Sequence, residues 1–299
     1  MLIRRLMILA IRFRNPDPLS KKSATLPSIE VVIPIALKDL HYLEKVLISL
    51  KKYCNNPISK IIIICPNKEA IKIPLTPEIT VFSDKDFLDL DLDLFRSNSP
   101  DIYGWCVQQL IKIKAVVTSN SRYVLWLDSD TLLNQHRAFV NSKYILEIVS
   151  DEFHLPYFIG LNKTLGFNVP KFRFSRVSHH ALVDVQLFNQ FALEKKMGSE
   201  MDWKNVIVSS LDYSSKAYAS NWFIFGKSSF SEYELNSLIL KKYNAKRKTT
   251  YWWNESRSRE TVDNKDFIEI ENGILENVSR LIRPTRPYSI SFHSWNINS

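Results

Sequence analysis

The chain has few glycines. Six occur among its 299 residues, about 2%, where roughly 7% is usual. No three of them form the G-x-G-x-x-G turn of dinucleotide-binding folds. Gly160 and Gly166 lie one residue too far apart for a Walker A loop, and Phe167 stands where its lysine should be. The sequence therefore excludes a glycine-rich loop that holds phosphates through backbone amides.

Cysteines and long apolar runs are scarce as well. Three cysteines are too few and too scattered for a disulfide scaffold or a zinc knuckle, and reduced thiols favour the cytoplasm. No run reaches the ~18 apolar residues of a membrane-spanning helix. Residues 1–12 imitate a signal peptide, but Arg12 and Arg14 interrupt the apolar stretch and a small-residue cleavage site is lacking. We expect a basic amphipathic arm that either rests on the inner face of the membrane or packs locally.

The chain does contain enough apolar material for a large core. Apolar residues make up 45% of the sequence and aromatic residues 12%, which argues against disorder. Lys and Arg outnumber Asp and Glu by 40 to 31, so the net charge is +9 and acidic partners are favoured. Prolines, serines and lysines over residues 15–28 indicate a linker. We therefore predict an arm and linker over residues 1–28 and one domain over residues 29–299.

Hydrophobic patterning predicts strands that alternate with helices. Apolar, mostly β-branched runs are typical of buried strands, and they occur at 29–34, 58–66, 79–82, 123–127 and 288–292. Helical spacing of apolar residues occurs at 39–53, 103–117, 178–195, 203–211 and 231–243. Residues 87–95 alternate Asp and Leu and fit either an edge strand or a loop. The order predicts an α/β fold with a mostly parallel central sheet flanked by helices and an elaborated helical C-terminal half.

Two aspartates follow the strand expected at 123–127. Asp128 and Asp130 are separated by one residue, and ligands of open α/β sheets bind beyond the carboxyl ends of the strands. Such a carboxylate pair can hold a hard divalent cation, which would neutralise charge on a departing diphosphate. The alternative is that both aspartates only cap a turn or a helix.

Phosphatases of the haloacid dehalogenase type also place D-x-D after a buried strand, with an aspartate as the nucleophile. Their pattern is D-x-D-x-T, whereas here Thr131 comes one residue early and Leu132 fills its position. Their motif also usually lies near the start of the chain. These departures weaken a phosphatase interpretation without eliminating it.

The helix expected at 103–117 carries a second polar group. Gln109 and Lys112 are three residues apart and share one helical face, as do Gln108 and Lys112. A lysine there could meet a phosphate, and an amide could fix a sugar or a base. The alternative is an amphipathic helix with a polar side.

Three histidines are further candidates. His179 and His180 would be neighbours on a helix, where they point about 100° apart, so they cannot readily bind one metal side by side. One could face a substrate while the other faces the core or solvent. His293 follows the last expected strand and could complete a metal site begun by the aspartates, or it could pack as an ordinary buried histidine.

The stretch Ser231 to Glu234 matches a capping box at the start of a helix. Glu232 would then lie exposed in the first helical turn, where it could deprotonate an acceptor hydroxyl or only favour the helix N-terminus. Farther along, residues 246–248 are basic and have aromatic neighbours, but no nucleic-acid-binding signature accompanies them. A solvated loop or an aromatic patch that binds the acceptor fits this stretch better.

The ordered set of motifs resembles a known family. Over roughly residues 29–295 the chain carries G-W-x-x-Q-Q-x-x-K, D-x-D, S-H-H, F-S-E-Y-E and F-H-S-W. The set is similar to a family of bacterial GT-A glycosyltransferase-like proteins associated with surface polysaccharides. The resemblance implies a nucleotide-sugar donor, a divalent Mn²⁺ or Mg²⁺ ion, a glycan or lipid-linked acceptor, and no nucleic acid. Cys106 departs from the family, where a bulkier aromatic residue is more typical.

The resemblance also implies roles for single residues near the donor. Asp130 would be the main metal ligand, Asp128 would lie near the ribose or the metal, and His293 would be a third ligand. Gln109 and Lys112 would lie near the donor.

We therefore expect a metal-dependent glycosyltransferase that moves a sugar from a nucleoside-diphosphate sugar to an acceptor hydroxyl. The resemblance places His180 and Glu232 near the acceptor. An inverting reaction would need a general base, with Glu232 as the first candidate and Asp184 as the second, whereas a retaining reaction would not. Two alternatives remain, a phosphatase or nucleotidyltransferase that uses Asp128 and Asp130, and a basic protein that binds nucleic acid or a membrane surface without catalysis.

Overall fold

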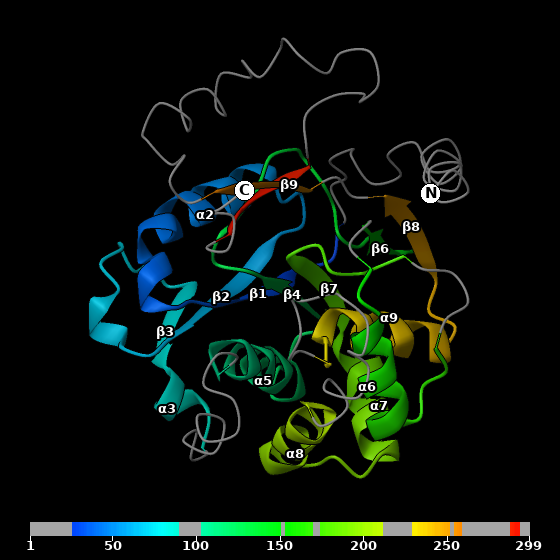
Figure 1. Cartoon of the computed structure of the whole chain (residues 1–299). Coiled ribbons are helices and arrows are strands. Elements are labelled where there is room, and N and C mark those ends of the chain that lie inside the picture. The colour runs from blue at the N-terminus through cyan, green and yellow to red at the C-terminus, as the bar shows by residue number, and fades with distance from the viewer. Residues whose placement is uncertain are drawn as a thin grey trace.

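A computed structural model of the chain describes residues 26–89, 103–150, 153–169, 174–211, 229–251, 254–258 and 288–293. The arm and most of the linker expected over residues 1–28 lie outside these ranges. The described residues form a layered α/β structure (Figure 1).

The central sheet has five strands in the order β3-β2-β1-β4-β7. These are β1 (Ile29–Pro34), β2 (Ile58–Cys65), β3 (Ile79–Ser83), β4 (Tyr123–Leu127) and β7 (His180–Asp184). The first four run parallel, and β7 pairs antiparallel with β4. The predicted α/β class with a mostly parallel sheet is confirmed.

The middle of this sheet is buried on both faces. Val31, Val32 and Ile33 of β1 are all 0% exposed, because helices or smaller strands cover both sides. Such runs of β-branched residues suit a buried parallel strand. Strands β2 and β3 lie on one side of β1, and β4 lies on its other side. The direction in which strands are added to the sheet therefore reverses between β1 and β4. Open α/β sheets bind ligands at such a reversal, beyond the carboxyl ends of the strands.

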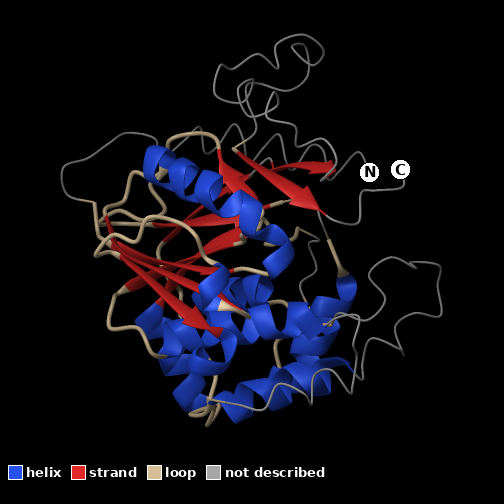
Figure 2. Ribbon diagram, turned by 90° about the vertical axis from the view of Figure 1, so that its left-hand side faces the viewer, coloured by secondary structure: helices blue, strands red, loops and turns tan. Residues whose placement is uncertain are grey.

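The layers on the two faces differ. Helix α2 (Leu40–Tyr53) packs on one face, with the small sheets nearby, and most other helices pack on the opposite face (Figures 1 and 2). The described helices beyond α2 are α3 (Asp84–Phe87), α5 (Tyr103–Val117), α6 (Leu155–Leu165), α7 (Val185–Glu194), α8 (Glu200–Leu211) and α9 (Glu232–Lys242), with short 3-10 turns at Leu37–Asp39 and Lys68–Ala70.

Two small sheets extend the α2 side of the molecule. One has the order β5-β10-β9, formed by β5 (Thr131–Leu133), β10 (Ser289–His293) and β9 (Asn254–Ser258). The other pairs β6 (Ile145–Val149) with β8 (Arg247–Tyr251) in parallel. Because β10 pairs antiparallel with β5, the last described strand lies beside the residues that follow Asp128.

The helix expected over residues 178–195 is wrong in its first part. Residues 180–184 form strand β7, and helix α7 begins only at Val185. Asp184 is the N-cap, because its side chain accepts a hydrogen bond from the N–H of Leu187 at 3.1 Å. The apolar spacing of α7 continues by chance into residues 180–184. The N-cap residue Asp184 marks where the strand ends and the helix begins.

Two smaller expectations also differ. The basic stretch 246–248 is not a solvated loop, because strand β8 begins at Arg247 and its guanidinium binds Glu147. Of the Asp/Leu stretch 87–95, Phe87 ends helix α3, and residues 90–95 lie outside the described part. Among the described helices, none combines the length and apolar character that crossing a membrane requires.

Candidate active site at the end of β4

The two aspartates lie in the tight connection between β4 and β5. The N–H of Asp128 donates to the carbonyl of His179 at 2.9 Å, and the N–H of Thr131 donates to the carbonyl of Asp128 at 3.1 Å. The first bond joins the end of β4 to the residue that precedes β7, and the second closes the turn that leads into β5. The pair therefore lies at the carboxyl end of β4, where the strand order reverses.

Asp128, Asp130 and His179 form a group that could hold a metal ion. Each offers one ligand atom, and the three atoms lie within 4.8 Å of one another. Nδ1 of His179 lies 3.3 Å from Oδ2 of Asp128. His179 has a φ of 61°, a left-handed conformation that a residue other than glycine rarely adopts. Two carboxylates and one imidazole are donors that divalent transition metals accept.

Lys112 lies behind this group as a buried cation. Its Nζ is 2.5 Å from Oδ1 of Asp128, 2.6 Å from Oε1 of Glu232 and 2.9 Å from the hydroxyl of Tyr233. Only 3% of the Lys112 side chain is exposed. Its backbone carbonyl accepts a hydrogen bond from the indole N–H of Trp126, which anchors α5 to the central strand. All three ammonium donor positions are therefore used.

The hydroxyl of Tyr233 completes this network. It donates to Oδ1 of Asp128 at 2.8 Å, and the Lys112 ammonium lies 4.4 Å from its ring centroid. The first turn of α9 thus contributes two adjacent residues, Glu232 and Tyr233, to the same buried cluster. Tyr233 belongs to the F-S-E-Y-E motif, but its local pattern predicts no role in the site.

Burial and pairing set the protonation of the cluster in opposite directions. Burial favours neutral Lys112, but the carboxylates of Asp128 and Glu232 outweigh it and raise the pKa of the ammonium. Burial likewise opposes ionised Asp128, yet Lys112 and His179 bring its pKa well below the usual range. Burial raises the pKa of Glu232 despite Lys112, with Asp128 adding to the effect. One ammonium is shared by two carboxylates, of which Glu232 takes up a proton more readily.

Gln109 lies on the same face of α5 as Lys112, as the spacing predicts. Its Oε1 accepts the backbone N–H of Glu232 at 3.1 Å, and the residue is 1% exposed. Glu232 is itself only 3% exposed, so the expectation of an exposed acid in the first helical turn is wrong. The physical reason is tertiary, because the first turn of α9 packs directly against α5.

His180 follows His179 in the chain but is not part of the group that could hold a metal ion. It is 0% exposed, its Nδ1 lies 2.7 Å from the carbonyl of Ser178, and its ring packs edge-on against Phe139. Burial lowers its pKa to about 3, so it is neutral at physiological pH. His179 lies just before β7 in its left-handed conformation and joins the aspartates, whereas His180 is the first residue of the strand and contacts Ser178 and Phe139.

Asp184 is not brought to the other candidates. It pairs with Tyr123 at the start of β4, whereas His180 pairs with Leu127 at its end. Four residues of strand correspond to about 13 Å. Asp184 binds the guanidinium of Arg122 at 2.6 Å and caps α7, which accounts for its burial without a catalytic role.

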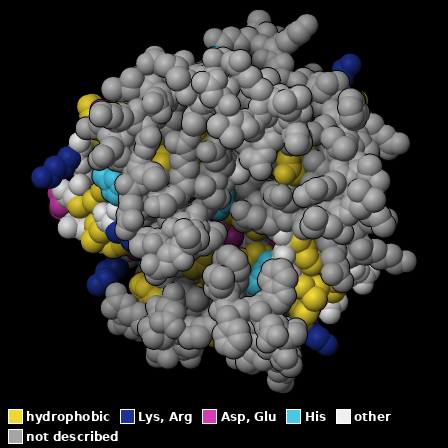
Figure 3. Space-filling model, turned by 45° about the horizontal axis from the view of Figure 1, so that its top comes forward, with side chains coloured by type: hydrophobic (Ala, Val, Ile, Leu, Met, Phe, Trp, Pro, Cys, Tyr) yellow, Lys and Arg dark blue, Asp and Glu magenta, His cyan; other side chains and the backbone are white. Residues whose placement is uncertain are grey.

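The backbone of His293 does reach the site. The N–H of Phe292 donates to the carbonyl of Asp130 at 3.0 Å, so His293 follows directly beside the aspartate turn. The side chain of His293 lies outside what the structure describes. In the space-filling view, acidic and histidine side chains appear recessed near the middle of one face, beside hydrophobic side chains (Figure 3).

The chain is similar to a solved structure described as galactosyltransferase LgtC in complex with donor and acceptor sugar analogs, at a TM-score of 0.40 and 10% identity, over 88% of this chain and 86% of that chain. A likeness this distant says nothing of activity. No curated protein matches the chain. Residues 26–266 match the model of a family described as "Family of unknown function (DUF6492)". Because this match covers most of the sequence, the chain belongs to the DUF6492 family.

Proposed function

We propose that the protein is a metal-dependent glycosyltransferase that moves a sugar from a nucleoside-diphosphate sugar to a hydroxyl of a glycan or lipid-linked acceptor. The observation that carries the proposal is the Asp128, Asp130 and His179 group beyond the carboxyl end of β4. In this proposal the diphosphate is held through a bound metal ion, which agrees with the lack of glycine-rich phosphate loops.

Of the two expected ions, the donor set favours Mn²⁺ over Mg²⁺, because carboxylates suit both ions whereas an imidazole suits a transition metal. Lys112 already balances the charge of Asp128, so Asp130 supplies most of the net attraction for a further cation. We propose His293 as an additional ligand, because its backbone lies beside Asp130. When bound, the ion would offset the charge that develops on the departing nucleoside diphosphate.

The residues behind the metal group have distinct proposed tasks. Lys112 holds Asp128 ionised and oriented, and Gln109 holds the first turn of α9 through the N–H of Glu232. Glu232 remains the candidate general base, because its raised pKa makes it a stronger base than an ordinary carboxylate. Since one of its oxygens binds Lys112, the other would receive the proton of the acceptor hydroxyl.

The contacts of Asp128 disfavour the alternative of a phosphatase in which Asp128 is the nucleophile. Its Oδ1 receives hydrogen bonds from both Lys112 and Tyr233, and its Oδ2 lies against His179. A carboxylate engaged at both oxygens, with its pKa held low, is a weak nucleophile. The paired charges of Lys112, Asp128 and Glu232 lie largely out of solvent. They therefore favour a formed ligand site over a basic surface that only binds polyanions.

The decisive experiment is a thermal-shift screen of nucleotide sugars with and without Mn²⁺. A ligand at one hundred times its dissociation constant adds about 2.7 kcal/mol to the free energy of unfolding. We expect at least one nucleoside-diphosphate sugar to stabilise the protein only when Mn²⁺ is present. Asp130→Asn should abolish this shift, whereas Asp86→Asn, an equal charge change at an exposed surface pair, should preserve it.

Two outcomes would contradict the proposal. The first is that no nucleoside diphosphate or its sugar stabilises the wild-type protein under any metal condition. The second is that both variants respond as the wild type does. Release of phosphate from simple esters, lost in Asp130→Asn, would point to a phosphatase instead.

A further inference from the structure

Glu234 is a buried acid that the proposed reaction does not use. It is 1% exposed, and its Oε1 accepts hydrogen bonds from the hydroxyl of Ser175 at 2.9 Å and from the N–H of Arg176 at 2.7 Å. In a capping box, its carboxylate would instead turn back to the N–H of Ser231. Only half of that box forms, because Ser231 accepts the N–H of Glu234 while the Glu234 side chain crosses to another segment.

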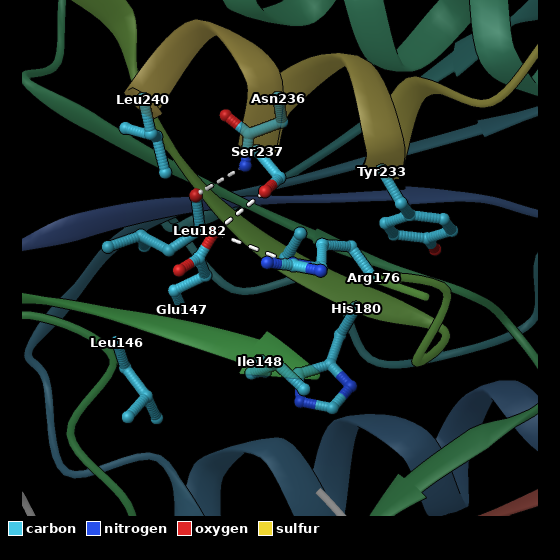
Figure 4. Close-up of a pocket in the computed structure, with 11 residues that line it drawn as sticks. Leu146, Glu147, Ile148, Arg176, His180, Leu182, Tyr233, Asn236, Ser237 and Leu240 are labelled. Atoms are coloured by element: carbon cyan, nitrogen blue, oxygen red, sulfur yellow. Dashed lines mark hydrogen bonds and ion pairs between the residues drawn. The ribbon is translucent and has the colours of Figure 1, made fainter. Parts of the chain in front are cut away.

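The segment that Glu234 binds leads directly into the candidate metal group. Residues 174–178 precede His179, and Ser150 holds their other side through backbone bonds to Ser175 and a hydroxyl bond to the carbonyl of Val177. The guanidinium of Arg176 also approaches Glu147, with Nε 3.5 Å from Oε1 (Figure 4). Residues 175–177, which lead into β7, are therefore held by hydrogen bonds to Glu234 and to Ser150 before the chain reaches His179.

His179 needs such support. Its left-handed φ of 61° is unfavourable for a residue with a β-carbon, and such conformations persist only where surrounding contacts over-determine them. Its carbonyl also receives the N–H of Asp128, so a shift of His179 would move the aspartate turn. Holding residues 175–177 thus holds both histidine and aspartate ligands.

Glu234 also belongs to the helix turn on the opposite side of the cluster. One and two residues before it, Tyr233 and Glu232 bind Asp128 and Lys112. A single buried carboxylate therefore connects α9, which holds Asp128 through Tyr233, to the segment that presents His179. We propose that Glu234 is a positioning residue that fixes the distance between His179 and Asp128, an inference that rests on the proposed metal site.

The role depends on hydrogen-bond acceptance rather than on charge. Both bonds arrive at one oxygen, and an amide oxygen has the two lone pairs needed to accept both. Burial raises the pKa of Glu234 to about 7, although Arg176 opposes the shift, so the charge is only partly present at neutral pH. Glu234→Gln should therefore preserve the connection, and Glu234→Leu should remove it at similar volume.

The test is a titration of the full chain with Mn²⁺ alone, combined with hydrogen exchange of residues 174–180. We expect Glu234→Leu to weaken Mn²⁺ binding by about 10- to 100-fold, the range seen when residues that orient metal ligands are changed. The N–H of Arg176 should exchange faster in that variant. Glu234→Gln should stay close to the wild type in both measurements.

Asn56→Leu is the matched control. Asn56 is a 2% exposed side chain that also joins separate segments, since it donates to the carbonyls of Pro27 and Val140 and accepts the N–H of Phe139. It precedes β2, at the amino end of the sheet, away from the site. It should lower stability without changing Mn²⁺ affinity. If Glu234→Leu does not fold, Ser175→Ala should shift both measurements in the same direction. It removes one of the two bonds to Glu234 and also the bond that the Ser175 hydroxyl accepts from the N–H of Val177.

Two results would contradict the role of Glu234. Wild-type exchange and Mn²⁺ affinity in folded Glu234→Leu, or an equal loss in Glu234→Gln, would overturn the inference. If the wild type itself does not bind Mn²⁺, the proposed metal site fails. The exchange of Arg176 then still decides whether Glu234 holds the segment before His179.

Discussion

Lys112→Met is the substitution that most directly tests the buried charge cluster. The side chain keeps its length and apolar stem but loses the ammonium that lies 2.5 Å from Asp128 and 2.6 Å from Glu232. The buried carboxylate of Glu232 and the partly buried carboxylate of Asp128 then lack the cation that they share. Removing one partner of a buried pair typically costs about 3–5 kcal/mol of the free energy of unfolding.

The loss should depend on pH in a definite direction. In the wild type the pKa of Asp128 is lowered, so its contribution to stability is present above the pKa of the unfolded chain and disappears as pH falls. In the variant, burial without Lys112 raises both carboxyl pKa values, which penalises the folded state as pH rises. The difference in stability between wild type and Lys112→Met should therefore be largest at pH 7–8 and smaller at pH 5.

Urea unfolding at several pH values measures this difference. Lys51→Met is the matched control, because Lys51 pairs with Glu78 at the surface and its side chain is 47% exposed. Exposed pairs contribute about 0–1 kcal/mol, so the control should change little at any pH. Adding Glu232→Gln to Lys112→Met should restore part of the loss. A Lys112→Met penalty below about 1 kcal/mol, or one independent of pH, would refute the assigned charges.

Two further substitutions address the hydroxyl and the acid of the first α9 turn. Tyr233→Phe removes the 2.8 Å bond to Asp128 and one acceptor of the Lys112 ammonium, so urea unfolding should show about 1–3 kcal/mol lower stability, and unchanged stability would contradict the network. Glu232→Gln should lower the transfer rate by about 10²–10⁴-fold and flatten the acid limb of its pH profile if Glu232 is the base, with donor binding retained. A full rate in Glu232→Gln would instead leave only its pairing with Lys112.

Much of the fold could be predicted from local patterns. The apolar runs at 29–34 and 123–127 are buried strands, and the helix expected at 103–117 has those bounds in the structure. These elements bury their whole length or one broad face, so burial leaves a clear period in the sequence. The same patterns located Asp128 and Asp130 after β4.

Other parts of the site have no local signature. Whether His179 or His180 meets the aspartates depends on where β7 begins, and the helical spacing of α7 obscured that boundary. The sequence predicts that Glu232 is an exposed acid in a first helical turn, but the packing of α9 against α5 buries it. Asp184 carries the same carboxylate chemistry but lies at the opposite end of β7.

The sequence alone determined the α/β class, the lack of glycine-rich phosphate loops and the position of the aspartate pair, because propensity, hydrophobic period and composition act over short stretches of chain. Tertiary structure decided which groups meet that pair. Lys112, Glu232 and Tyr233 reach Asp128 or its partners from α5 and α9, and His179 reaches it from the residue before β7, only when these elements pack on the sheet. Burial there removes water from the charged groups, so an unpaired charge would cost much free energy. The same loss of water, together with the position of Lys112, determines which carboxylate stays ionised.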